Sequence, residues 1–179
     1  MRDQHSDEEL IARARNGDMT AFKMLVERYE GKVAGIIKPM LGDTPPAVDV
    51  GQEVFIRFYE SLGKFKGESS LGTYLVRIAI NLSLNEIKRM KRRDRIFQPL
   101  EMGHDVKDDG SSSDLHEMLY HEINKLDSDF KIVVTLRMIE GYTTDETSKI
   151  LNIPLGTVLS RLARAQHKLR HVLSKQGDL

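Results

Sequence analysis

Apolar residues recur every three or four positions through most of this sequence, and that spacing restricts the chain to helices. They follow one helical face over residues 22–37 and again over residues 75–82. No stretch alternates convincingly with the period of two that is typical of strands. The longest β-branched run, residues 132–135, lies inside a helical pattern. We therefore expect an all-α fold.

Local signals place the helix boundaries. Ser6 with Glu9 is typical of a capping box, and Gly17-Asp18 should end the first helix. The prolines of residues 42–46 indicate a turn, because proline fixes φ and lacks a backbone donor. We expect further helices over residues 20–37, from about Ala47 to Leu62, and from Thr73 to about Arg93, with a loop over residues 63–72.

Charge divides the chain, although its 27 basic and 27 acidic residues cancel. Residues 1–97 carry 17 Lys/Arg against 14 Asp/Glu, residues 98–129 carry 2 against 9, and residues 130–179 carry 8 against 4. Residues 98–113 are rich in Pro, Gly, Ser and Asp. We expect two small helical domains, residues 1–97 and 114–179, joined by a flexible acidic linker over residues 98–113. The basic run from Lys88 to Arg95 favours a polyanionic partner.

A helix-turn-helix pattern occupies residues 144–173. Thr144 is expected to cap its first helix, Ser148 is small where two helices approach, and Asn152 can adopt the left-handed conformation that the turn needs. Val158 would anchor the second helix, whose inward face continues through Leu162, Ala165, Leu169 and Val172. The opposite face should carry Thr157, Ser160, Arg161, Arg164 and Lys168. Arginines and hydroxyls on a short helix suit the major groove of DNA.

Composition argues against several other classes of protein. The chain has no cysteine, which suits a reducing compartment, and no apolar run approaches the roughly 20 residues of a transmembrane helix, so we expect a soluble cytoplasmic protein. His167 and His171 have zinc-compatible spacing, but no carboxylate joins them. Residues 105–110 resemble part of a calcium loop, with Lys107 at a ligand position. We expect no enzyme activity, metal or cofactor.

Three segments, in order, resemble the extracytoplasmic-function (ECF) group of the sigma-70 family of bacterial sigma factors. Residues 49–55 (Asp-Val-Gly-Gln-Glu-Val-Phe) are similar to region 2.2, and residues 65–82 to regions 2.3 and 2.4. Residues 141–170 are similar to region 4.2. The resemblance spans nearly the whole chain. It implies a factor that directs core RNA polymerase to promoters and assists their opening, under the control of an anti-sigma factor that is commonly associated with the membrane.

The resemblance also implies site residues. Contact with polymerase, through the β′ clamp and the β flap, would involve Asp49, Gln52, Glu53, Ile56 and Arg57 on the first domain. The −10 promoter element would meet Lys64, Phe65, Lys66, Tyr74, Arg77, Asn81, Lys88, Arg89 and Arg92. The −35 element would meet Thr157, Ser160, Arg161, Arg164 and Lys168. Ile80 and Leu159 stand where the family commonly has basic residues, which puts promoter preference in doubt.

Two readings from other classes remain open at this point. A stand-alone regulator, such as the output module of a response regulator, would explain the helix-turn-helix, but its receiver would require strands in the first half. A module that sequesters another protein would not need two basic surfaces. On the sigma-factor reading, Arg161→Ala should weaken promoter binding by about 1–3 kcal/mol and relax specificity at one base.

Overall fold

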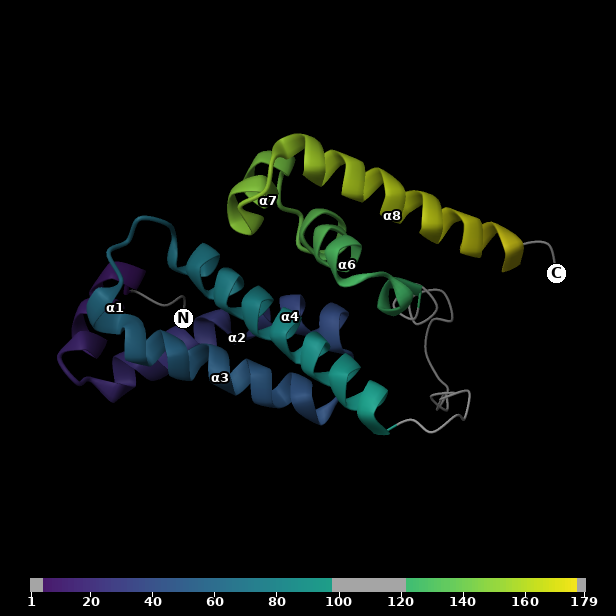
Figure 1. Ribbon diagram of the computed structural model, residues 1–179. Helices are drawn as coiled ribbons and strands as arrows, with labels where there is room; N and C mark the ends of the chain where they lie inside the picture. Colours follow the sequence, from purple (N-terminus) through teal and green to yellow (C-terminus); the bar gives the residue numbers. More distant parts are fainter. Residues whose placement is uncertain (1–4, 98–121, 177–179) are drawn as a thin grey trace.

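The protein is helical throughout the part described by the computed structural model, which covers residues 5–97 and 122–176 (Figure 1). The first half contains α1 (Asp7–Arg15), α2 (Met19–Leu41), α3 (Pro45–Ser61), the 3-10 turn η1 (Leu62–Lys64) and α4 (Leu71–Phe97). The second contains α6 (Ser128–Val134), the π-helical turn η2 (Thr135–Ile139), α7 (Thr144–Leu151) and α8 (Leu155–Gln176). The all-α prediction is confirmed. The predicted linker, residues 98–113, lies outside the described residues.

Capping residues explain where most helices begin. The Ser6 hydroxyl accepts from the Glu9 amide at 3.2 Å, as the sequence predicted. Asp18 accepts from the amides of Thr20 and Ala21 at 3.0 and 3.1 Å. These backbone amides and Arg13 lower the pKa of the Asp18 carboxyl, because they stabilise its charged form. The break at Gly17-Asp18 is therefore both a helix end and a cap for the next helix.

Three predicted boundaries were wrong by one or two residues. α3 begins at Pro45 rather than Ala47, because proline at the first helical position sacrifices no hydrogen bond. α4 begins at Leu71 rather than Thr73, with the Ser70 hydroxyl accepting from the Thr73 amide. The cap of α7 is Thr143 rather than Thr144, and it forms a complete capping box with Glu146.

The helices form two layers that pack against each other. α1–α4 make the lower layer in Figure 1 and α6–α8 the upper one. Each layer has buried apolar side chains of its own: Phe58, Val54 and Leu75 in the first, and Val134, Ala165 and Leu169 in the second. The large core cluster also crosses between the layers, where it takes in Ile132, Val133, Leu136, Ile150 and Val158. The two domains consequently share an apolar interface.

Candidate nucleic-acid interface

The outer side of α3 carries the residues expected to contact a protein partner. Asp49, Gln52, Ile56 and Arg57 are exposed, and the half-buried Glu53 accepts from Arg57 Nε at 2.7 Å. Ile56 is 52% exposed, which is high for a large apolar side chain on a charged helix. Its neighbours on the helix face inward, because Val54 and Phe58 are completely buried. The predicted set therefore shares one accessible helix face.

An apolar groove of about 910 Å³ runs between α2 and α3 beside this face. Val26, Val33, Ile37 and Phe55 line it. Its rim includes Val48, which is 61% exposed and which the sequence analysis passed over. The sequence did indicate that Val48 could belong to this surface, since Val48 directly precedes the polar stretch that begins at Asp49. An exposed apolar rim next to charged residues suits a protein interface.

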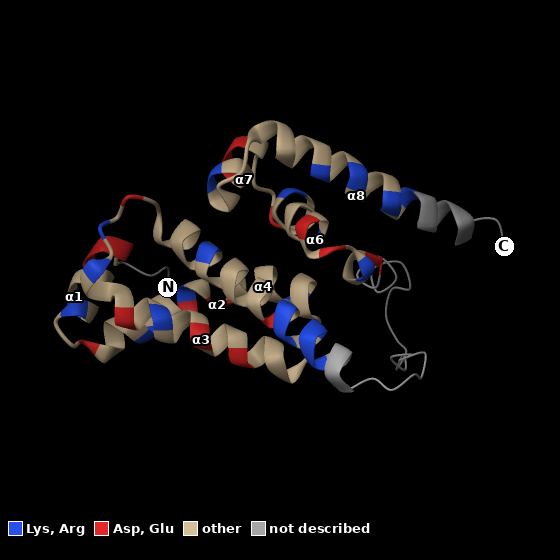
Figure 2. Cartoon of the chain, in the orientation of Figure 1, with Lys and Arg blue, Asp and Glu red and all other residues tan. Residues whose placement is uncertain are grey.

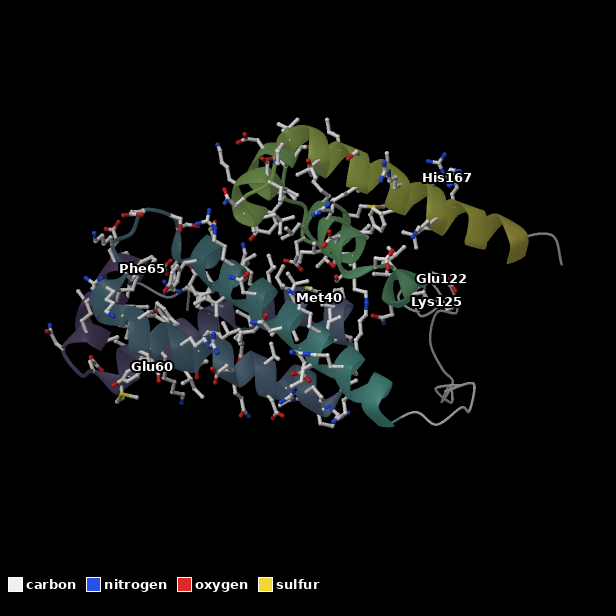
Figure 3. All side chains as sticks on the ribbon, in the orientation of Figure 1. Met40, Glu60, Phe65, Glu122, Lys125 and His167 are labelled. Atoms are coloured by element: carbon white, nitrogen blue, oxygen red, sulfur yellow. The ribbon has the colours of Figure 1, made fainter. Side chains whose placement is uncertain are left out.

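The loop after α3 is held by an aromatic cluster. The Phe65 and Tyr74 rings lie 4.9 Å apart between centroids, and both pack against Phe58. The Tyr74 hydroxyl donates to Ser61 Oγ at 2.9 Å. Arg15 donates to the carbonyl oxygens of Leu62, at 2.9 Å, and of Phe65. The two predicted aromatic site residues thus meet, and Figure 3 places Phe65 near the α1 end of the lower layer.

Lys64 and Lys66 flank that cluster with exposed side chains. Between the two lysines, Phe65 is only half-buried. Gly67 follows Lys66 and has φ of 71°, a conformation that favours glycine and turns the loop. Cations beside a partly exposed aromatic ring are suitable for binding a nucleic-acid base and its phosphate.

The predicted −10 residues of α4 separate into two groups. Lys88, Arg89 and Arg92 are exposed near its C-terminal end, where they form the blue patch of Figure 2 together with Lys91 and Arg93. Arg89 Nε pairs with Glu86 at 2.9 Å. The exposed Asn81 and the half-buried Arg77 lie earlier on the helix and face the second domain. Only the first group forms an open basic surface.

α7 lies against the face of α4 that carries Arg77 and Asn81. Arg77 donates through Nη2 to the carbonyl oxygen of Lys149 at 2.9 Å. A cavity of about 470 Å³ between the helices is lined by side chains from both domains. Its apolar wall includes Ile80 of α4 and Ile150 of α7, which are both buried. In this closed arrangement the second domain limits access to this part of the predicted −10 surface.

Two ionisable groups lie in the same interface, the buried Lys131 and the half-buried Glu140. Lys131 Nζ donates to the carbonyl oxygen of Met40, at the end of α2, and to Asn124 Oδ1, at 3.4 and 3.3 Å. Figure 3 shows Met40 between the two layers. Burial, with a smaller effect from Lys91, lowers the pKa of the Lys131 ammonium. The placement near a helix C-terminus partly compensates, because the helix dipole favours a cation there.

Glu140 is the second group and is half-buried. Its carboxylate lies close to Gly35 of α2, so a larger residue at position 35 would have to displace it. Burial raises the pKa of Glu140, and Lys32 partly opposes that shift. Lys32 also lies over the Tyr142 ring, 5.2 Å from its centroid. The interface therefore desolvates, at least in part, groups of both signs, which disfavours their charged forms while it is closed.

The helix-turn-helix is built as its residues indicated. Asn152 has φ of 52°, the left-handed conformation expected of the turn. Ser148 donates through its hydroxyl to the Ile153 carbonyl at 2.6 Å, and the Ile153 amide donates to the Ser148 carbonyl. Val158 is completely buried and anchors α8 as predicted. The turn thus fixes the angle at which α8 leaves α7.

The predicted −35 residues lie along one side of α8 but differ in exposure. Ser160, Arg164 and Lys168 are exposed, whereas Thr157 and Arg161 are half-buried. Arg161 and Lys168 lie toward α6: Arg161 Nη2 pairs with Asp129 at 2.6 Å, and Lys168 Nζ with Asp127 at 3.3 Å. Two of the five are therefore paired with acidic side chains at α6, which runs along one flank of α8.

Leu155 was missed as a surface residue, whereas Leu159 was noted as an apolar replacement of a basic residue. They are 45% and 49% exposed and lie one turn apart on the first half of α8. Ala163 and His167 continue the exposed side of the helix. Only polar side chains of α8 were chosen as site residues, so neither leucine was assigned a contact.

Metal and membrane sites can be assessed only for the described residues. Within residues 5–97 and 122–176, no three His, Asp or Glu side chains gather in a way that could hold a metal ion. His167 is exposed on α8, the side chain of His171 lies outside the described part, and so do residues 105–110. Over the same described residues, no helix is long and apolar enough to span a bilayer.

Comparison with protein families gives two matches. The model for "Sigma-70 region 2" matches residues 25–93, and that for "Sigma-70, region 4" matches residues 116–169. The chain is 35% identical to the ECF RNA polymerase sigma-E factor of Haemophilus influenzae, over 96% of this chain and 97% of that protein. It is 34% identical to the RNA polymerase sigma-H factor of Pseudomonas aeruginosa, over 95% of each.

Solved structures have a similar fold. CnrH, in complex with the cytosolic domain of CnrY, superposes with a TM-score of 0.69 at 23% identity, over 93% of this chain and 96% of that one. The sigma factor RpoE of Bartonella quintana, in complex with the anti-sigma factor NepR, gives a TM-score of 0.68 at 19% identity, over 86% and 96%. Both likenesses extend across the two helical layers.

Proposed function

The chain belongs to the ECF group of the sigma-70 family, and from that premise we propose that it is a transcription initiation factor that directs core RNA polymerase to promoters. The observation that carries the proposal is the pair of basic surfaces on separate domains, at the end of α4 and along α8. We assign residues 1–97 to polymerase and the −10 element, 98–113 to a connecting linker, and 114–179 to the −35 element. The factor acts in the cytoplasm and catalyses no reaction itself.

Polymerase binding is assigned to α3. Its accessible face offers Asp49, Gln52 and Arg57 around the exposed Ile56, and the apolar groove beside it adds Val48. An apolar centre with a charged rim is the usual anatomy of a protein interface. The β′ clamp is the proposed partner of this face, and the β flap that of the second domain. An anti-sigma factor is proposed as a competing partner, because the structurally similar RpoE was solved with the anti-sigma factor NepR.

Promoter binding is assigned to α4, the loop before it, and α8. Arg89 and Arg92 would neutralise phosphates of the −10 element, a contribution that falls as salt concentration rises. Phe65 and Tyr74, with Lys64 and Lys66, would receive an unstacked base. On α8, Ser160 and Arg164 would reach base edges directly, an assignment that their exposure supports. Arg161 and Lys168 would have to exchange their partners Asp129 and Asp127 for DNA.

The closed arrangement of the two domains restricts which residues of α4 can bind promoter DNA. Arg77 is committed to the Lys149 carbonyl while α7 lies on α4, so it can contact promoter DNA only after the domains separate. We propose that binding to polymerase supplies the free energy for that separation. The buried Lys131 and the half-buried Glu140 reduce the amount needed, because both gain water when the interface opens.

The rival readings are disfavoured by the structure of the first half. A receiver domain requires a sheet, and the described residues 5–97 contain helices and loops only. A sequestering module has no use for an exposed basic patch at the end of α4 as well as one on α8.

Binding measurements test the proposal. The full chain should bind core polymerase and form a complex on promoter DNA that survives a competitor. Arg164→Ala and the double variant Arg89→Ala/Arg92→Ala should weaken that complex without weakening polymerase binding. Lys23→Ala, an exposed lysine on α2 that pairs with Glu27, is the matched control. Wild-type promoter binding by both basic-surface variants would refute the assignment.

A further inference from the structure

Two leucines interrupt the polar surface of α8 where it should approach the −35 element. Leu155 and Leu159 are one helical turn apart and about half exposed, while Val158 between them is completely buried. Ser160 and Arg164 are also exposed on α8, further around its surface. Gly156 and Ala163 project almost no side chain, so the leucines form a low apolar ridge beside polar groups. Single exposed leucines need no explanation, but a paired ridge on a basic helix does.

The surroundings of the ridge favour DNA over a protein as its partner. Arg164, Lys168 and Arg170 are exposed on the same helix, and residues 130–179 have twice as many basic as acidic residues. A stable protein interface buries on the order of 800 Å² per partner, which two half-exposed leucines between a glycine and an alanine cannot provide. Positive charge on the same helix as a small apolar ridge instead favours a DNA partner.

The major groove presents one apolar group on its floor, the C5-methyl of thymine. A leucine that enters the groove has no donor or acceptor to match to other base edges, and it would leave a polar edge without its water. Resting on the proposed function of α8, we infer that Leu155 and Leu159 are specificity-determining residues that pack against thymine methyl groups in the −35 element. The −35 sequence should therefore contain an A·T pair beside the bases read by Ser160 and Arg164.

Replacing thymine with deoxyuridine tests this inference, because it removes the methyl and keeps every hydrogen bond. The promoter is first selected from random DNA with holoenzyme made from core polymerase and the full chain. Holoenzyme affinity is then compared on duplexes with thymine or deoxyuridine in the −35 element. We expect deoxyuridine to weaken binding about fourfold for each methyl contacted. The same replacement outside both promoter elements should change nothing.

Variants connect that loss to the ridge. Leu159→Ala should bind the thymine duplex more weakly, and its penalty for deoxyuridine should fall below about twofold. Met19→Ala removes an equally exposed apolar side chain on α2 and should keep the full penalty. Leu159 is half exposed, so the variant should fold, which its thermal unfolding curve checks.

Four outcomes would overturn the inference. The selected −35 element could lack an A·T pair, or wild-type holoenzyme could bind both duplexes equally. The deoxyuridine penalty could persist unchanged in Leu159→Ala. That variant could also lose affinity for core polymerase itself, which would make the ridge a protein contact. A promoter with the whole −35 element scrambled separates these results from failure of the proposed function. If the proposed function is wrong, holoenzyme should bind the scrambled promoter as well as the original; if only the inference about the leucines is wrong, it should bind the scrambled promoter more weakly.

Discussion

Ile80→Ala should open the interface between the two domains. Ile80 is 4% exposed on α4 and shares its cavity with Ile150 and Leu151 of α7. Truncating a buried isoleucine to alanine costs about 2–5 kcal/mol. We expect a value near the lower end of this range, because the neighbouring cavity already leaves Ile80 with few packing contacts on one side. A loss of about 2 kcal/mol changes the ratio of closed to open molecules roughly 30-fold.

The absence of cysteine makes the assay direct. Cysteines placed at Glu60 on α3 and His167 on α8 would be the only thiols, and both positions are exposed on outer faces of the two layers (Figure 3). Single-molecule energy transfer between dyes at these sites then counts closed and open molecules. Leu75→Ala is the control, because Leu75 is buried on the same helix but does not line that cavity. The reasoning fails if Ile80→Ala lowers the free energy of unfolding by about 2 kcal/mol and leaves the fraction of closed molecules unchanged.

Three further predictions concern single residues. Burial raises the pKa of Glu140, so its carboxylate form destabilises the closed interface. The free energy of unfolding should therefore increase as pH falls through the raised pKa toward 4.5, the ordinary value of a glutamate. Glu140→Gln should abolish this contribution in denaturant titrations at pH 7 and pH 5, and an identical pH response in both proteins would contradict it. Asn152→Ala should lower the free energy of unfolding by about 1–2 kcal/mol, because alanine is strained at φ of 52°. Asn152→Gly should leave it nearly unchanged. Equal unfolding midpoints for the two variants would exclude backbone strain as the cause. Arg164→Ala should lower holoenzyme affinity for the promoter by about 1–3 kcal/mol and relax the preference at one base, and a binding-site selection that matches the wild type would rule out a base contact.

Local features of the sequence predicted the local structure well. Ser6, Asn152 and the Gly17-Asp18 break act on residues within five positions, so their effects follow from backbone hydrogen bonds alone. The inward faces of α3 and α8 followed from helical spacing, and Val54 and Val158 are indeed completely buried. The loop aromatics Phe65 and Tyr74 also meet as a functional cluster requires.

Contacts between distant segments could not be predicted in this way. Lys131 reaches a carbonyl 91 positions away, and no pattern around Lys131 indicates that Met40 will be there. Helical spacing turned Arg161 outward, but it could not show that α6 places Asp129 beside it. Arg77 is similarly held by α7 rather than left open. The position of one helix against another depends on the summed packing of both, which single motifs do not contain.

Run-off transcription with purified core polymerase tests the central claim most directly. Core enzyme alone should give no specific transcript from a linear template that carries the selected promoter, and addition of this chain should give one transcript of defined start. Scrambling either promoter element should remove that transcript. A chain that binds core polymerase yet leaves initiation random, or that directs initiation regardless of both elements, would contradict the assignment of two promoter-reading surfaces to its two domains.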